Sequence, residues 1–211
     1  MMGTETTLSF QALQKGGSSM KTLLITGFDP FGGENINPSW EAVKRLPDVI
    51  GNCRVQKMQI PTVFGEAAQT VLRQAEELKA DIILSVGQAG GRAAVTPERI
   101  GINIRSASIA DNKGNMPQEQ PIVPGGSDGI FATVPVAAMV ESIKEAGLPG
   151  AVSNSAGTFV CNDVLYTLLH HFAGTATRVG FIHVPYLPEQ GTPSLSLEDT
   201  VRALERVILV L

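Results

Sequence analysis

Cys161 has the side chain and the position to act as a nucleophile. It follows the small-residue stretch SNSAGTFV (153–160) and stands at the start of an expected helix. The free N–H groups and the dipole of a helix N-terminus lower the pKa of a thiol and can hold an oxyanion. The alternative is that Cys161 fills space, because free cysteine is among the most buried residue types.

A cysteine nucleophile needs a base, and His183 is the histidine best placed to be one. It lies in the apolar run FIHV, at the end of an expected strand. His170 and His171 end an expected helix, where an imidazolium faces the helix dipole favourably, so we take both as structural. A lone histidine on an apolar strand is more often a hydrogen-bonded core residue. Both interpretations of His183 stand at this point.

A third group should orient the imidazole, and a carboxylate is the usual one. Glu98, in TPERI, precedes an expected strand, but after Pro97 it could equally be a solvated turn residue. Asp163, two residues after Cys161, fits instead a charge in the first turn of the helix. Spacing alone does not choose between these interpretations of Glu98.

The elements that must position these groups alternate between strand and helix. We expect strands at 21–26, 53–60, 81–86, 99–104, 150–154 and 177–184, and helices at 38–46, 66–79, 135–145, 162–171 and after Ser196. Apolar strands in turn with helices predict a three-layer α/β/α fold with a mostly parallel central sheet, in a single domain. The polar stretch 106–129 is expected to be a functional loop or an extra hairpin.

In such folds ligands bind beyond the carboxyl ends of the strands. The segment GQAGGR (87–92) follows one expected strand, the loop to Cys161 follows another, and His183 ends a third. This convergence is the main argument from the residues that Cys161 and His183 act together. The segment GQAGGR matches neither a P-loop nor a dinucleotide fingerprint, and neither HExxH nor CxxC occurs, so we expect no cofactor and no metal.

Composition limits the class of protein further. The 211 residues are 43% apolar and 17% charged, which suits one globular domain. A net charge of −4 argues against a nucleic-acid partner. The sequence contains no run of about 18 apolar residues, so we expect no membrane span. The only cysteines, Cys53 and Cys161, suit free thiols in a reducing cytoplasm.

The first nineteen residues differ from the rest of the chain. They lack the basic start and long apolar stretch of a secretory signal, and they end in the linker-like GGSS. We therefore expect residues 1–19 to be a flexible N-terminal extension and residues 20–211 to form the α/β domain.

Several motifs, in order, carry a family resemblance. They are TGFDPFGGENINPS (26–39), VGQAGGR (86–92), TPERIGIN (96–103), DNKGN (111–115), VSNSAGTFVCN (152–162) and FIHVPYLPEQ (181–190). Together they resemble the pyroglutamyl-peptidase I family, also called pyrrolidone-carboxylate peptidases, over nearly all of residues 20–211. That family consists of cytosolic cysteine peptidases that remove N-terminal pyroglutamate from peptides. The resemblance implies a triad of Cys161, His183 and Glu98, and a homo-oligomer, either a dimer or a tetramer.

The implied substrate makes further residues candidates. Pyroglutamate is a flat, neutral lactam, so its pocket needs apolar walls and a few hydrogen bonds. Phe28 and Phe31 follow the first strand and could sandwich the ring, or they could be ordinary core aromatics; in the family their motif lines the pocket. Gln88 can hydrogen-bond an amide, and Phe159 and Val160 are expected to touch the ring.

Other interpretations stay open. The stretch Arg105–Ser108 departs from the acidic pair and arginine that family members often carry there, so the resemblance assigns no active-site arginine. The chain could be a small-molecule binding module in which Cys161 and His183 merely pack, or another Cys-His-Glu amidohydrolase. The latter usually shows a G-x-C-x-G nucleophile elbow, whereas the context here is FVCND. A phosphate-using, nucleosidase-like activity is a further alternative, and it predicts phosphate-dependent turnover.

Overall fold

A six-stranded sheet forms the centre of the computed structural model, which describes residues 20–211. The expected extension, residues 1–19, lies outside the described residues. Within them the strand order is β2-β3-β1-β4-β8-β5. The four inner strands run parallel: β1 (Lys21–Phe28), β3 (Cys53–Ile60), β4 (Ile82–Gln88) and β8 (Arg178–Val184). The two edge strands are short and antiparallel: β2 (Val49–Ile50) and β5 (Thr96–Pro97).

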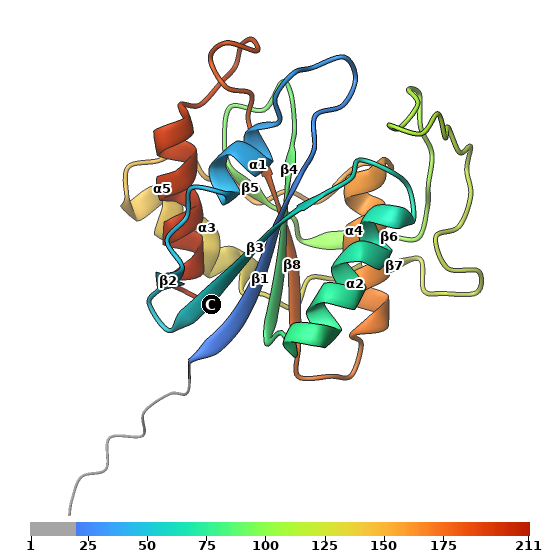
Figure 1. Ribbon diagram of the computed structural model, residues 1–211, viewed down its shortest axis with the longest axis horizontal. Helices are drawn as coiled ribbons and strands as arrows, with labels where there is room; N and C mark the ends of the chain where they lie inside the picture. The colour runs from blue at the N-terminus through green and yellow to red at the C-terminus, as the bar shows by residue number, and fades with distance from the viewer. Residues whose placement is uncertain (1–19) are drawn as a thin grey trace, which may run out of the picture.

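Helices cover both faces of this sheet (Figure 1). One face carries α1 (Pro38–Val43), α3 (Val136–Glu145) and α5 (Leu197–Ile208). The other carries α2 (Glu66–Leu78) and α4 (Val160–His171). The expected single-domain, three-layer α/β/α fold with a mostly parallel sheet is confirmed. Among the helices of residues 20–211, none is long and apolar enough to cross a membrane.

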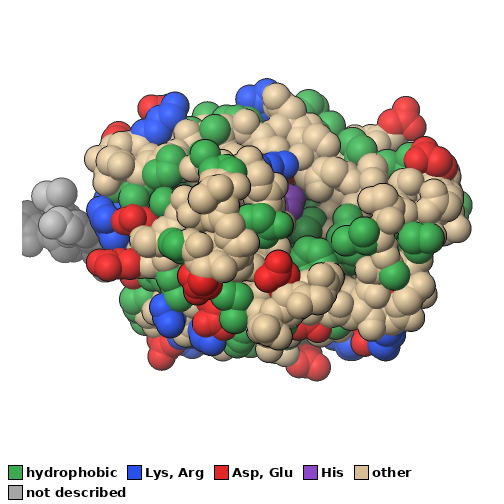
Figure 2. All heavy atoms as spheres, turned by 90° about the horizontal axis from the view of Figure 1, so that it is seen from above, with side chains coloured by type: hydrophobic (Ala, Val, Ile, Leu, Met, Phe, Trp, Pro, Cys, Tyr) green, Lys and Arg blue, Asp and Glu red, His purple; other side chains and the backbone are tan. Residues whose placement is uncertain are grey.

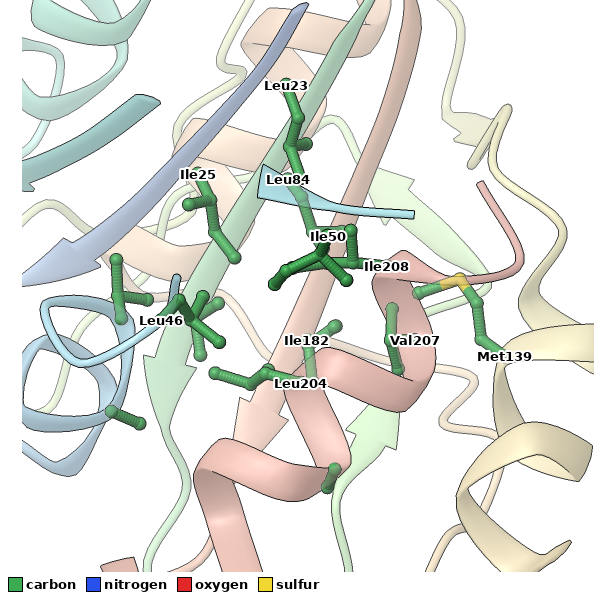
Figure 3. Packing of buried hydrophobic residues seen from close by; sticks show 14 of the residues in the cluster. Leu23, Ile25, Leu46, Ile50, Leu84, Met139, Ile182, Leu204, Val207 and Ile208 are labelled. Atoms are coloured by element: carbon green, nitrogen blue, oxygen red, sulfur yellow. The ribbon is translucent and has the colours of Figure 1, made fainter. Parts of the chain in front are cut away.

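The core lies in two layers, one on each face of the sheet. On one face the side chains of β1, β4 and β8 pack against Leu204, Val207 and Ile208 of α5 (Figure 3). On the other face Leu24, Ile83 and Phe181 belong to the cluster beneath α2 and α4. Because helices cover both faces, β1, β4 and β8 are buried almost continuously, whereas β3, next to the edge, has exposed and half-buried polar positions.

Local capping signals predicted two helix starts correctly. The Asn37 side chain caps α1 by accepting from Ser39 N, with Pro38 as the first helical residue. Ser196 caps α5 in the same way by accepting from Asp199 N. A side-chain oxygen at the N-cap satisfies a free N–H of the first turn, so these signals act independently of the rest of the fold.

Several expected elements differ in the structure. The helix expected at 38–46 ends at Val43. The expected strand 150–154 makes only isolated bridges, Val95 with Gly150 and Glu98 with Ser153. The expected strand 99–104 shrinks to β6 (Ile100–Ile102), which pairs with β7 (Gly129–Phe131) outside the main sheet. The Asn162 side chain bonds the backbone of residues 102 and 104, and so occupies groups that a longer strand would pair. Finally, α4 begins at Val160, two residues earlier than expected.

The polar stretch 106–129 is mostly an irregular loop that connects β6 to β7. The Asp111 carboxylate anchors it by accepting from the backbone N–H groups of Lys113, Asn115 and Phe64. These hydrogen bonds tie the loop to the segment between β3 and α2, on the same side of the sheet as α4.

Candidate active site

Cys161 and His183 lie at the same end of the sheet, near the end of β4. Gly87 of β4 pairs in register with His183 of β8, and registered residues of parallel neighbours present side chains on the same face. A Cβ built on Gly87 would lie 2.9 Å from the Cys161 sulfur and 2.9 Å from the Phe181 ring. The Phe181 and His183 rings are themselves 4.9 Å apart. The thiol therefore lies over a residue without a side chain, beside the imidazole.

The Glu98 carboxylate hydrogen-bonds with one nitrogen of the His183 imidazole. The distance from His183 Nδ1 to Glu98 Oε1 is 2.7 Å, and both side chains are buried. The short strand β5 brings them together, because Thr96 pairs with His183 and Glu98 N donates to Phe181 O at 2.9 Å. With Nδ1 engaged by the carboxylate, Nε2 is the nitrogen left to exchange a proton.

Cys161 lies in the first turn of α4, not before it. The first N–H groups of a helix lack intrahelical acceptors and point out of its N-terminus. Cys161 therefore has oxyanion donors close to its own backbone. Asn162 fixes this end of the helix by donating to Ile102 O and Ile104 O and by accepting from Ile102 N.

Loss of solvent keeps both the half-buried Cys161 thiol and the buried His183 imidazole neutral. Burial, and then the negative charge of Glu98, raises the pKa of the Cys161 thiol to about 12. Burial also lowers the pKa of His183, against the hydrogen bond and charge of Glu98, which raise it. The sequence suggested that the helix N-terminus lowers the thiol pKa; here loss of solvent outweighs it. The resting pair is thus a thiol and a neutral imidazole that can accept its proton.

Glu98 itself is ionised despite its burial. Burial raises the pKa of its carboxyl, but the hydrogen bond and charge of His183, with bonds from Ser153 and Arg92, outweigh that and lower it. Only Oε1 takes part in a close hydrogen bond; Oε2 is buried without a close partner among residues 20–211. His183 and Arg92 therefore share one oxygen of the Glu98 carboxylate.

Arg92 is the basic residue at this site, and the sequence reasoning did not assign it. Its Nη1 donates to Glu98 Oε1 at 2.8 Å and to Thr96 Oγ1 at 2.6 Å, and its Nη2 donates to Ser155 O at 3.1 Å. The available signal was its place at the end of the motif GQAGGR, just after β4. No residue spacing indicates its bond to Ser155, because the two are 63 residues apart.

Asp163 lies in the first turn of α4 as expected, but it is not a solvated charge. It is fully buried, and its carboxylate accepts from Arg105 Nε at 2.6 Å and from Gly65 N at 2.7 Å. Arg105 begins the stretch that departs from the family pattern. Arg105 therefore supplies a partner for the buried carboxylate and ties the residue just before the long loop to α4.

Aromatic rings gather around Phe159, two residues before Cys161. The Phe31 ring centroid lies 5.9 Å from that of Phe159, and the Phe64 ring meets Phe159 edge-on at 5.2 Å. Phe64, which the sequence reasoning missed, is on the turn between β3 and α2. In contrast, Phe28 is buried against Phe181, 6.2 Å between centroids, in the core beneath α2 and α4.

The remaining pocket candidates have different surroundings. The Val160 side chain is fully buried in the same core cluster as Phe28. Gln88 ends β4 half-buried, and its Oε1 accepts from Gln190 Nε2 at 3.1 Å. Gln190 belongs to the motif that contains His183, so this amide pair links the ends of both central strands.

Cavities border the aromatic group. One of about 510 Å³ is lined by Phe159, Thr158, Gln118 and residues 106–109; another of about 420 Å³ is lined by Phe64 and Arg105 among others. Neither is lined by Cys161 or His183, so they flank the nucleophile rather than contain it. Figure 2, which looks onto the edge where β1 ends, shows a hollow with hydrophobic side chains, a histidine and a basic side chain.

The fold and the site together define a class: three-layer α/β proteins with a cysteine, histidine and glutamate gathered at the carboxyl ends of parallel strands. Comparison with known proteins narrows that class. The family profile described as "Pyroglutamyl peptidase" matches residues 20–211, and the chain belongs to this family.

Curated relatives and solved structures agree with this assignment. The pyrrolidone-carboxylate peptidase of Escherichia fergusonii is 50% identical over 197 residues, 90% of this chain and 92% of the relative. That of Levilactobacillus brevis is 52% identical over 193 residues, covering 88% and 95%. The crystal structure of pyroglutamyl peptidase I from Bacillus amyloliquefaciens superposes with a TM-score of 0.88 at 45% identity, covering 90% of this chain and 96% of that one.

Proposed function

We propose that this protein hydrolyses the amide bond after an N-terminal pyroglutamate, with Cys161 as nucleophile. The observation that carries the proposal is the 2.7 Å bond between Glu98 and His183, with the Cys161 sulfur over Gly87, the strand partner of His183. The names of the relatives, pyrrolidone-carboxylate peptidase and pyroglutamyl peptidase, support the same substrate.

The first half of the reaction transfers the acyl group to the enzyme. The neutral His183 takes the thiol proton while the Cys161 sulfur attacks the carbonyl carbon of the pyroglutamyl amide. The N–H groups at the start of α4 hold the oxyanion. As the intermediate collapses, the imidazolium returns its proton to the leaving amine, and a pyroglutamyl thioester stays on Cys161. Glu98 stabilises the imidazolium that forms between these steps.

The second half releases the product. His183 removes a proton from water, which attacks the thioester carbon; the C–S bond breaks and the thiolate recovers the proton from His183. Free pyroglutamate leaves, and the neutral thiol–imidazole pair is restored. The raised pKa of the thiol favours this return to the protonated form.

The substrate pocket proposed here is the aromatic group near Cys161. Phe31 and Phe159 supply apolar faces for a flat lactam, and Phe64 holds the Phe159 ring from its edge. Gln88 supplies an amide for the lactam N–H or carbonyl. Val160 and Phe28 are buried beneath these groups, so we propose that they support the pocket from within the core.

Three broader proposals accompany the activity. Residues 20–211 form the catalytic domain, which is supported by the extent of the family match. The protein acts in the cytoplasm as a homo-oligomer, a dimer or a tetramer; its two free cysteines suit a reducing compartment. Its partners are peptides that begin with pyroglutamate. Size-exclusion chromatography with light scattering measures the oligomeric state directly.

The proposed activity is tested with a pyroglutamyl fluorogenic amide, with proline and unblocked glutamate amides as substrate controls. We expect wild type to cleave only the pyroglutamyl amide. Cys161→Ser should abolish cleavage and Cys53→Ser should keep it, because Cys53 is buried near the start of β3, at the opposite end of the sheet. Folded wild type that binds pyroglutamate without turnover would overturn the proposal in favour of a binding module.

A further inference from the structure

We propose that Arg92 is a positioning residue of this active site, holding Glu98 and the loop that leads to Cys161 in one geometry. The inference rests on the proposed peptidase activity. It starts from a connection that the triad alone does not supply: His183 and Glu98 bond directly, whereas Cys161 lies in the first turn of α4, after a separate loop, 153–159.

A backbone bridge joins Glu98 to Ser153 at the start of that loop, and the guanidinium of Arg92 adds a side-chain link further along it. Nη1 donates to Glu98 Oε1 at 2.8 Å, and Nη2 donates to Ser155 O, in the loop that precedes Cys161, at 3.1 Å. Two nitrogens of one rigid, planar group thus set the distance between the carboxylate and the loop. A lysine could reach only one of these acceptors with comparable geometry.

A third hydrogen bond links Arg92, through Thr96, to β8, the strand that carries His183. Arg92 Nη1 also donates to Thr96 Oγ1 at 2.6 Å, and the Thr96 hydroxyl lies 3.4 Å from His183 O, to which it donates. Arg92 is therefore connected to Glu98 directly, to the loop before Cys161 through Ser155 and to β8 through Thr96. About 30% of its side chain is exposed, so Arg92 lies at the surface of the site and not in the core.

The charge of Arg92 also acts on the two groups that exchange a proton. It lowers the pKa of Cys161, against the larger effect of burial. It also lowers the pKa of His183, in the same direction as the larger effect of burial. The charged groups that act on this pair are Glu98 and Arg92, and those that act on Glu98 are His183 and Arg92. Removing the positive charge should therefore raise both pKa values, which moves the pH profile to higher pH.

The test compares Arg92→Gln, Arg92→Lys and the matched control Arg99→Gln. Arg99 adjoins Glu98 in sequence and is exposed, and no hydrogen bond from its side chain to the triad occurs in residues 20–211. We expect Arg92→Gln to lower kcat about 10- to 100-fold with KM within about threefold, and to shift the kcat/KM profile upward. Arg92→Lys should keep the wild-type pH profile but lower kcat, because lysine keeps the positive charge and lacks the two donor nitrogens of the planar guanidinium. Arg99→Gln should match wild type.

A kcat for Arg92→Gln within twofold of wild type would overturn the proposal. A rise in KM with an unchanged kcat would also overturn it, because Arg92 would then be a substrate contact instead. A second readout separates this failure from failure of the proposed function: the rate at which iodoacetamide alkylates Cys161 against pH, followed by mass spectrometry of its peptide. The Arg92→Gln curve should shift to higher pH even if the fluorogenic amide is not a substrate; an unshifted curve would refute the role.

Discussion

The Cys161 sulfur lies over Gly87, so close that a Cβ on Gly87 would approach it to 2.9 Å. The same Cβ would meet the Phe181 ring, on which the His183 ring packs. The missing side chain of Gly87 therefore makes the space that the Cys161 thiol occupies beside the Phe181 ring. The glycine is required here by close approach and not by an unusual backbone angle.

Gly87→Ala should damage the site more than the fold. The added methyl displaces Cys161 or Phe181, so we expect kcat/KM to fall about 10- to 100-fold and stability to fall by about 1–3 kcal/mol. The control is Gly180→Ala on β8, whose Cβ would meet Val134 at 2.4 Å on the other face of the sheet. It should destabilise comparably in thermal melts while the folded enzyme keeps its kcat. Equal losses of kcat in both variants would contradict the expectation.

The acid limb of kcat/KM should lie below pH 6.5. His183 must be neutral to accept the thiol proton, and burial lowers its pKa; the base therefore stays competent to lower pH than a free imidazole. A stopped-time assay with the fluorogenic amide across pH 4–9 measures this. An acid limb above pH 7 would show that Glu98 outweighs burial in the free enzyme.

Glu98→Gln should shift that limb downward and slow the reaction. The carboxylate raises the pKa of both His183 and Cys161, so removing its charge lowers both, opposite in sign to Arg92→Gln. We expect kcat to fall about 10²–10⁴-fold, because the imidazole loses its orientation and its counter-charge. An upward shift, or a kcat near that of wild type, would remove Glu98 from its assigned role.

Asp163→Asn should destabilise the protein by about 1–3 kcal/mol, because a fully buried carboxylate loses charged hydrogen bonds to Arg105 and Gly65. Arg105 is 25% exposed and can turn to solvent, which limits the cost. Chemical denaturation measures the change. Glu141→Gln is the control, since its ion pair with Lys144 is exposed and should be worth under about 1 kcal/mol. Comparable effects of the two substitutions would refute the buried pair as an anchor of the long loop.

Replacing Phe31 or Phe28 by Ala should have different effects, because Phe31 is a proposed pocket residue and Phe28 is a core residue. Phe31 contacts Phe159 near the nucleophile, so Phe31→Ala should raise KM for the pyroglutamyl amide about tenfold with a small change in stability. Phe28 is buried against Phe181, so Phe28→Ala should cost about 3–5 kcal/mol of stability. Steady-state kinetics and thermal melts on both variants decide. The reverse pattern would exchange their roles.

Sequence patterns predicted the main elements because their signals are local. Apolar runs mark β1, β4 and β8, and side-chain caps mark the starts of α1 and α5. The errors fall where pairing depends on distant partners. Residues 150–154 find only isolated bridges, and residues 99–104 are divided between β7 and the Asn162 side chain. The residues of either segment do not indicate which distant parts of the chain lie beside it in the fold.

By itself, the sequence determined the α/β class and the family resemblance, because these follow from residue types, their order and short-range patterns. The same patterns made Cys161 and His183 candidates for the chemistry, whereas Glu98 became the third only through the family resemblance. Only the tertiary structure decided that Gly87 makes room for the thiol, that Arg92 joins Glu98 to Ser155, and that burial reverses the expected shift of the Cys161 pKa. The physical reason is that steric room, hydrogen-bond reach and loss of solvent are set by neighbours tens of residues away, which become adjacent only when the chain folds.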